Sequence, residues 1–262
     1  MKKLCLSAML LILVGGTILA GGALDNSTPN VPKSNKQAPV QPSGDVQPVG
    51  PQPKIVLPEK SFDFGYAPEG FFMVHPYTIR NEGEAELVIE RVRTTCGCTS
   101  APLEKTNIEP GDETHVTVIF NSRRYKHRTS KGTIISSNDP VNRSVRATFT
   151  ANMDTTGLPF EIEPFGLSIE KGKKPPKKMV FKIKNGSDQN YELSVVDYTS
   201  DVLKEPKIKN KKLKAGGKTE IAVEMNKDYD YAANYIKASF TVEASGKKPI
   251  RFTIPIKGSG PQ

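Results

Sequence analysis

The sequence lacks tryptophan and has only three cysteines and three histidines among its 262 residues. Cys5 lies in an N-terminal apolar run, so the pair Cys96 and Cys98 stands alone in the rest of the chain. The widely separated cysteines and the buried tryptophan of antibody domains are therefore missing, which excludes that kind of domain. Calcium loops, phosphate-binding glycine loops and nucleophile elbows are missing too. We therefore expect no enzyme and no cofactor.

A long apolar run occurs at the start of the chain. The basic Lys2 and Lys3 precede it and small residues at 20–23 follow it, which indicates a signal peptide over residues 1–23. We expect export to the periplasm or the cell surface. The alternative is an uncleaved anchor, because a membrane span needs about 20 apolar residues. No cysteine follows the run at the position used for lipid attachment, so we expect membrane contact only through an uncleaved N-terminal segment.

Residues 24–54 contain seven prolines and few large apolar side chains. Such a segment cannot bury a core, so it is predicted to be a disordered linker that holds the folded part away from a membrane or a processing site. The chain that follows is long enough for two domains of ordinary size.

No amphipathic helical pattern of convincing length follows the linker. Instead, apolar and polar residues alternate in short runs, which is typical of half-buried strands. Turn-forming sequences separate these runs at the spacing of a small β-sandwich. The runs are 55–57, 73–79, 87–92, 115–120, 132–136 and 145–149. The fold class is therefore predicted to be all-β.

The second half of the chain repeats the first at an offset of 104 to 105 residues, so that Ile-Arg-Asn at 79–81 corresponds to Ile-Lys-Asn at 183–185. Two copies of one domain explain this repeat. Neither sheet of a sandwich buries its inner face alone. We therefore predict two tandem immunoglobulin-like β-sandwich domains, at 55–154 and 158–260.

The basic excess of the chain belongs to the second copy. Residues 158–262 carry twenty basic and thirteen acidic groups, whereas residues 55–157 carry twelve and thirteen. Nineteen of the twenty basic groups are lysines, which suit a hydrated surface better than bidentate contacts to bases or phosphates. Two interpretations stay open, a solvated face and attraction to anionic polymers of the envelope. The export signal argues against nucleic acid as a partner.

Several motifs of the first copy occur in the order of a known family. They are Phe62-Asp63-Phe64-Gly65, Asn81-Glu82-Gly83, Leu87-Val88-Ile89, Cys96-Gly97-Cys98-Thr99, Ile108-Glu109-Pro110-Gly111 and Ser137-Asn138-Asp139-Pro140. Together they resemble the bacterial immunoglobulin-like domain of unknown function marked by a Cys-Gly-Cys-Thr motif, which is similar to the domains of hydin and major sperm protein. Over residues 55–152, the resemblance implies a secreted or periplasmic β-sandwich with no assigned enzymatic activity. The copy at 158–258 lacks the cysteine motif, so there the resemblance implies the fold alone.

One glycine separates Cys96 from Cys98, and free thiols are unusual in an exported protein. On an extended strand their Cα atoms would lie roughly 6.5 Å apart, near the limit for a disulfide. Four interpretations stay open. They are two small buried residues, a disulfide within the motif or to another chain, a soft-metal site for copper or zinc with help from Met73 or His75, and a catalytic thiol pair.

Two further observations bear on these interpretations. The second copy has Ser200 and Val202 where the first has its cysteines, so the fold can be built without them. The histidines His75, His115 and His127 lie on separate segments without metal-ligand spacing, and we expect them to be strand or loop residues.

The densest basic cluster lies between two predicted strands and includes Arg123, Arg124, Lys126 and Arg128. A loop at one end of a sandwich is a usual place for binding residues, so these four residues form a candidate binding loop. A plain solvated hairpin is the alternative.

The expected function is a non-catalytic binding, adhesion or scaffold module in the periplasm or at the cell surface. It would contact an envelope protein or an anionic glycan through sheet edges or loops, which is an analogy with other sandwiches of this kind. The alternatives are a soft-metal carrier that uses Cys96 and Cys98, and a thiol-disulfide redox protein.

Overall fold

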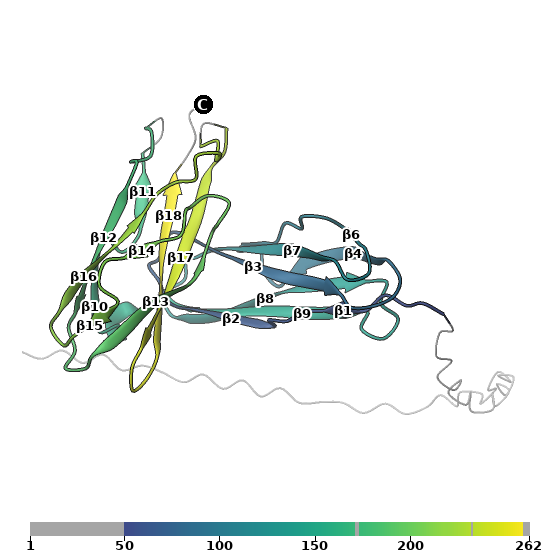
Figure 1. Cartoon of the computed structure of the whole chain (residues 1–262), viewed down its shortest axis with the longest axis horizontal. Coiled ribbons are helices and arrows are strands. Elements are labelled where there is room, and N and C mark those ends of the chain that lie inside the picture. The colour runs from purple at the N-terminus through teal and green to yellow at the C-terminus, as the bar shows by residue number, and fades with distance from the viewer. Residues whose placement is uncertain (1–49, 171–172, 232, 259–262) are drawn as a thin grey trace, which may run out of the picture. The chain divides into compact units, whose positions relative to one another are not determined.

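The computed structural model describes residues 50–170, 173–231 and 233–258 (Figure 1). The expected signal peptide, and the expected linker up to residue 49, lie outside the described residues. Apart from one short 3-10 helix, Thr155–Gly157, the regular elements of these ranges are strands, so the predicted all-β class is confirmed. No helix within the same ranges is long and apolar enough to span a bilayer.

The first β-sandwich packs around a core in which Phe64, Tyr77 and Phe120 have no exposed surface. Five of the six alternating runs predicted from the sequence lie within its strands, and the run 55–57 extends one residue beyond the first strand. The strands are β1 (Ile55–Val56), β2 (Ser61–Tyr66), β3 (Phe72–Asn81), β4 (Leu87–Thr94), β5 (Thr99–Ser100), β6 (Asn107–Ile108), β7 (Glu113–Asn121), β8 (Arg128–Ser137) and β9 (Ser144–Asn152).

The second β-sandwich has a separate core in which Phe181, Phe240 and Phe252 are fully buried. Its strands are β10 (Phe160–Glu163), β11 (Leu167–Ile169), β12 (Met179–Asn185), β13 (Tyr191–Tyr198), β14 (Lys207–Ile208), β15 (Lys212–Leu213), β16 (Lys218–Val223), β17 (Ile236–Ser245) and β18 (Ile250–Gly258).

Each sandwich has one four-stranded sheet of its own, ordered β1-β3-β7-β5 in the first and β10-β12-β16-β14 in the second. The opposing layers belong to one continuous sheet, ordered β15-β13-β17-β18-β2-β9-β8-β4-β6. Its two halves meet where β18 and β2 pair in parallel, at Phe252 and Tyr66. Main-chain pairing therefore continues from one core to the other.

Side chains also join the two sandwiches. The imidazole of His75 in β3 lies 3.0 Å from the carboxylate of Asp197 in β13 and 3.0 Å from that of Glu59. Gly65 has a left-handed backbone with φ +66°, and a Cβ atom there would lie 2.0 Å from the carbonyl oxygen of Arg251. Because only glycine permits both features, Gly65 allows β2 to approach β18 closely.

A buried asparagine closes the same turn in both sandwiches. The side-chain amide of Asn81 donates to two carbonyl oxygens at 2.8 and 2.9 Å, and that of Asn185 donates to two at 2.7 and 3.0 Å. One of the two acceptors lies four residues further along the chain in each case. The hydrogen bonds thus follow the offset of the sequence repeat.

Candidate functional site

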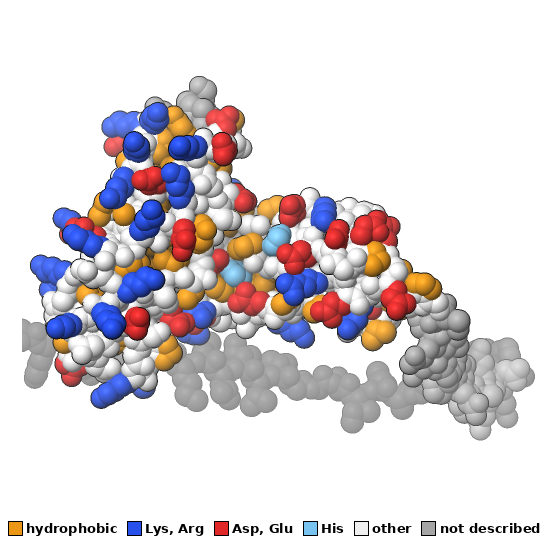
Figure 2. Space-filling model, viewed as in Figure 1, with side chains coloured by type: hydrophobic (Ala, Val, Ile, Leu, Met, Phe, Trp, Pro, Cys, Tyr) orange, Lys and Arg blue, Asp and Glu red, His pale blue; other side chains and the backbone are white. Residues whose placement is uncertain are grey.

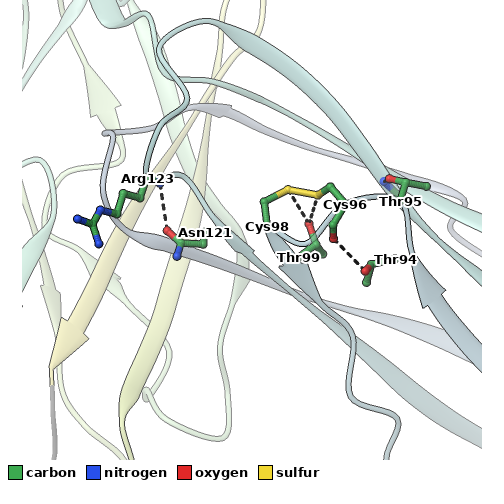
Figure 3. The surroundings of a disulfide bond; sticks show 8 residues. Thr94, Thr95, Cys96, Cys98, Thr99, Asn121 and Arg123 are labelled. Atoms are coloured by element: carbon green, nitrogen blue, oxygen red, sulfur yellow. Dashed lines mark hydrogen bonds between the residues drawn. A yellow bond between two sulfur atoms is a disulfide. The ribbon is translucent and has the colours of Figure 1, made fainter.

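Cys96 and Cys98 lie in the turn between β4 and β5, and their sulfur atoms form a disulfide (Figure 3). The Cα atoms are 5.3 Å apart, closer than the roughly 6.5 Å of an extended strand, because the chain turns at Gly97. Of the four interpretations that the sequence leaves open, the structure contains the disulfide.

The hydroxyl of Thr99 lies against both sulfur atoms. Its Oγ1 is 3.4 Å from Cys96 Sγ and 3.6 Å from Cys98 Sγ, and its side chain is buried (Figure 3). Three hydrogen bonds hold the turn: Thr94 Oγ1 donates to the Cys96 carbonyl at 3.0 Å, the Thr99 backbone amide donates to the same carbonyl at 3.4 Å, and the Asn121 backbone amide donates to the Cys98 carbonyl at 2.9 Å. The sulfurs are therefore held beside a hydroxyl that can donate to either of them.

A surface hollow of about 560 Å³ adjoins the disulfide. Its lining residues are Gly97, Cys98, Asn121, Arg123, Arg124 and Tyr125. They meet because β5 pairs with β7, which brings the segment after β7 next to the cysteine turn. The cysteine motif and the basic cluster lie apart in the sequence, whereas the structure brings Arg123 and Arg124 to the same hollow as Cys98.

Arg124 has a left-handed backbone with φ 82°, and it is the one non-glycine residue of the described ranges with a positive φ. That conformation costs an L-residue roughly 1–2 kcal/mol. Strained residues of this kind gather at functional loops. Arg124 thus lines the hollow in a backbone conformation that is unfavourable for a residue with a side chain.

The other two residues of the predicted binding loop do not line the hollow. Arg128 is the first residue of β8, and its guanidinium lies 3.7 Å from the Asp63 carboxylate and 3.4 Å from the Thr150 hydroxyl. Lys126 is exposed in the loop itself. The predicted loop must therefore be corrected: Arg128 belongs to a strand, where it contacts its neighbour β9 and, beyond β9, strand β2.

The residues expected to help the cysteines bind a metal have other contacts. Met73 is fully buried in the first core, and both ring nitrogens of His75 face carboxylates of Glu59 and Asp197. Within the described ranges, no group of three or more His, Cys, Asp or Glu side chains is arranged to hold a metal ion. A disulfide also offers no thiolate, which copper and zinc require. This geometry does not favour a soft-metal carrier.

The disulfide contributes little to the stability of the fold. A closed loop of three residues gives about 1.6 kcal/mol in the chain-entropy description, about half of what a 15-residue loop gives. The second sandwich forms the equivalent turn without a disulfide. The two turns correspond because Leu203 pairs with Met225 in the second sandwich, in the same way that Thr99 pairs with Phe120 in the first. There Val202 occupies the position of Cys98 and is buried.

The outer face of the sheet β10-β12-β16-β14 is a second candidate surface. We call it the lysine face. With its adjoining loops and the neighbouring edge strand β15 it presents Lys178, Lys182, Lys184, Lys204, Lys207, Lys209, Lys211, Lys212, Lys214 and Lys218. Figure 2 shows basic side chains gathered over the part of the molecule that contains β12, β14 and β16.

Three of these ten lysines form ion pairs with described carboxylates. They are Lys184 with Glu161 at 2.7 Å, Lys204 with Glu224 at 2.8 Å, and Lys209 with Glu220 at 3.6 Å. The hydrogen bond from Lys204 and its charge hold the pKa of Glu224 below its ordinary value, with smaller contributions from more distant lysines. The other seven lysines have no ion pair with a described carboxylate. The ten lysines outnumber the six glutamates that line the same hollows, so the face carries a net positive charge.

Residues 55–153 match the model of a family described as "Protein of unknown function (DUF1573)". The match spans the first sandwich, and it confirms the resemblance at the level of a family of unknown function. The finer similarity to hydin and major sperm protein stays a prediction. No curated protein matches the chain.

Several solved structures are similar to the chain. A protein of unknown function from Porphyromonas gingivalis W83 is 12% identical, over 78% of this chain and 99% of that chain, with a TM-score of 0.33. The CupB2 chaperone of Pseudomonas aeruginosa is 11% identical, over 76% of this chain and 98% of that chain, with a TM-score of 0.31. The PapD-like domain 7 of human CEP192 is 11% identical, over 47% of this chain and 96% of that chain, with a TM-score of 0.32. These likenesses are loose.

Proposed function

We propose that the protein is an exported, non-catalytic binding or scaffold module of the bacterial envelope, attached to an anionic glycan through the lysine face of its second sandwich. The periplasm or the cell surface is the proposed location, on the basis of the signal-peptide pattern at residues 1–23. The proline-rich residues 24–54 suit a spacer between a surface and the folded part.

The observation that carries this proposal is the group of seven lysines on the lysine face without ion pairs to described carboxylates. An ammonium group on a flexible stem is strongly hydrated and makes few demands on geometry. Several such groups on one face fit a repeating polymer whose charges are spread along its length. A small molecule would instead require a shaped pocket with convergent polar groups.

The test compares two variants that each remove four positive charges. One replaces Lys182, Lys207, Lys212 and Lys218 of the lysine face by Ser, and the matched control replaces Arg123, Arg124, Lys126 and Arg128 by Ser. Binding of the full chain to alginate, a linear polyuronate, is measured by calorimetry, with neutral dextran as the reference polymer. At about 0.35 kcal/mol for each exposed charge, within the range measured for exposed pairs, four charges give about 1.4 kcal/mol, so the lysine variant should bind alginate about tenfold more weakly.

The control variant should bind alginate within about twofold of the wild type, because its charges lie on the other sandwich. Added salt should weaken wild-type binding, since exposed charges are screened over about 10 Å at 0.1 M. Loss of binding only in the arginine variant would move the proposed surface to the hollow. Equal losses of alginate binding in both variants would show that binding follows the net charge of the protein and not the lysine face.

A further inference from the structure

The disulfide is partly exposed, and a hollow adjoins one of its two sulfur atoms. Cys96 and Cys98 are half-buried rather than buried, and the hollow lies next to Cys98. Figure 3 places Asn121 and Arg123, which line that hollow, on the Cys98 side of the S–S bond. A thiolate attacks one sulfur of a disulfide and expels the other. A thiolate in the hollow therefore meets Cys98 Sγ, with Cys96 Sγ as the leaving atom.

The hydroxyl of Thr99 is positioned to help that departure. It lies 3.4 Å from Cys96 Sγ, the closer of its two sulfur contacts. A hydrogen bond to a charged form stabilises that form, and a thiol of lower pKa leaves faster in exchange. The second sandwich has the apolar Leu203 at this position, so neither its turn nor its packing requires a hydroxyl there.

The mouth of the hollow carries positive charge. Arg123 and Arg124 both line it, and both are exposed. Neither residue forms an ion pair with a described carboxylate, unlike Arg128, which faces Asp63. Two guanidinium groups attract an incoming thiolate, which is the reactive form of a thiol.

We propose that Cys96 and Cys98 form a reversible redox site that exchanges electrons with a dithiol of an exported partner protein. The partner's first thiolate attacks Cys98 Sγ, the S–S bond breaks, and Cys96 leaves as a thiolate that takes up a proton. The partner's second thiolate then attacks the partner's first sulfur atom, which is bonded to Cys98 in the mixed disulfide, and Cys98 is released. Two electrons and two protons pass to Cys96 and Cys98, and the partner becomes a disulfide. This proposal does not depend on the lysine face.

The first experiment follows the reduction of the folded, oxidised chain by dithiothreitol. Samples are alkylated over time, and peptide mass gives the state of Cys96 and Cys98. In Thr99→Val, which keeps the shape but loses the hydroxyl, reduction should be roughly three- to tenfold slower, as expected for one hydrogen bond to a leaving thiolate. Thr99→Ser should restore the wild-type rate. Thermal unfolding of each variant shows whether the fold has changed.

The second experiment tests which sulfur is attacked. Cys96→Ser leaves Cys98 beside the hollow, and Cys98→Ser leaves Cys96 on the far side. With oxidised glutathione, the Cys96→Ser variant should form its mixed disulfide several-fold faster than the Cys98→Ser variant. Equal rates would contradict the assigned direction of attack.

Two results would overturn the proposal as a whole. One is a disulfide that dithiothreitol reduces only when urea unfolds the chain, because the bond would then be structural. The other is an equal rate for wild type, Thr99→Val and Thr99→Ser, because the hydroxyl would then have no part in exchange. Alginate binding, measured on the same variants, should be unchanged, so a failure here leaves the proposed function in place and a failure of alginate binding leaves this site in place.

Discussion

In the first sandwich the turn after β4 is closed by a disulfide and carries the hydroxyl of Thr99, whereas the equivalent turn after β13 buries Val202 and Leu203. Leu203 is 1% exposed and belongs to the second core, while Cys98 is only partly buried at the edge of the first. The second turn is therefore stabilised by apolar burial. The first turn keeps its two sulfur atoms near the surface. The fold therefore needs the turn but not the disulfide, which is a feature of the first copy.

The largest effect is expected from breaking the apolar turn. Leu203→Ala removes a fully buried side chain and should lower the free energy of unfolding by about 3 kcal/mol. Replacing both Cys96 and Cys98 by Ser should cost only about 1.6 kcal/mol, because the closed loop is so short. Urea unfolding measures both, and hydrogen exchange should place the loss in the sandwich that carries the change. A larger cost for the cysteine pair than for Leu203 would contradict this comparison.

A second difference between the sandwiches is a buried carboxylate. Asp139 accepts hydrogen bonds from the backbone amides of Ile55 at 2.9 Å and of Val141 and Asn142 at 2.8 Å. Burial alone would raise the pKa of Asp139, but these amide donors outweigh it and hold the pKa below its ordinary value. The second sandwich lacks this Asn-Asp-Pro turn. Asp139 therefore fastens the first strand to the β8–β9 loop in one copy only.

Asp139→Asn should lower the free energy of unfolding by about 2 kcal/mol at pH 7, because an amide donor then faces a backbone donor. A carboxylate whose pKa is lowered by folding stabilises the fold above its ordinary pKa, near 4, and loses that effect as the pH falls through the folded value. The difference between variant and wild type should therefore shrink in urea unfolding at pH 3. A difference that is the same at pH 3 and pH 7 would show that the charge of Asp139 has no role.

Local patterns in the sequence predict the strands well and their long-range pairing poorly. The run 115–120 alternates cleanly and lies within β7, since one face packs on the core. β2 alternates too, with Phe62 and Phe64 buried, but its partners are β9 and β18, far along the chain. The continuous sheet shared by both sandwiches depends on such pairings, and no turn sequence encodes them.

The candidate site shows the same limit. The sequence identifies Cys96 and Cys98 as unusual and Arg123 and Arg124 as a basic cluster, since both features are local. Their meeting at one hollow depends on the pairing of β5 with β7, and β5 is only two residues long. The contact of Thr99 with both sulfurs depends on the turn of the chain between the two cysteines. An extended strand at this place, which the sequence suggests, gives the wrong distance between their Cα atoms.

The smallest expected effect has the opposite sign and concerns the strained residue of the first sandwich. Arg124→Gly relieves a left-handed backbone that costs an L-residue roughly 1–2 kcal/mol, while glycine adds an entropic cost of roughly 0.5–1 kcal/mol. The net result should be a gain of about 0.5 kcal/mol in the free energy of unfolding. Urea unfolding of this variant against wild type measures it.

Arg123→Gly is the matched control, because it removes the same side chain from a neighbouring position outside the left-handed region. It brings only the entropic cost, so it should destabilise the chain by roughly 0.5–1 kcal/mol. Both variants remove one guanidinium from the hollow and should slow reduction by the anionic thiol glutathione to a similar extent. If Arg124→Gly makes the chain more stable and its disulfide less reactive, the arginine contributes its charge to the hollow at a cost in backbone strain. Equal destabilisation by both changes would show that the backbone at Arg124 is not strained.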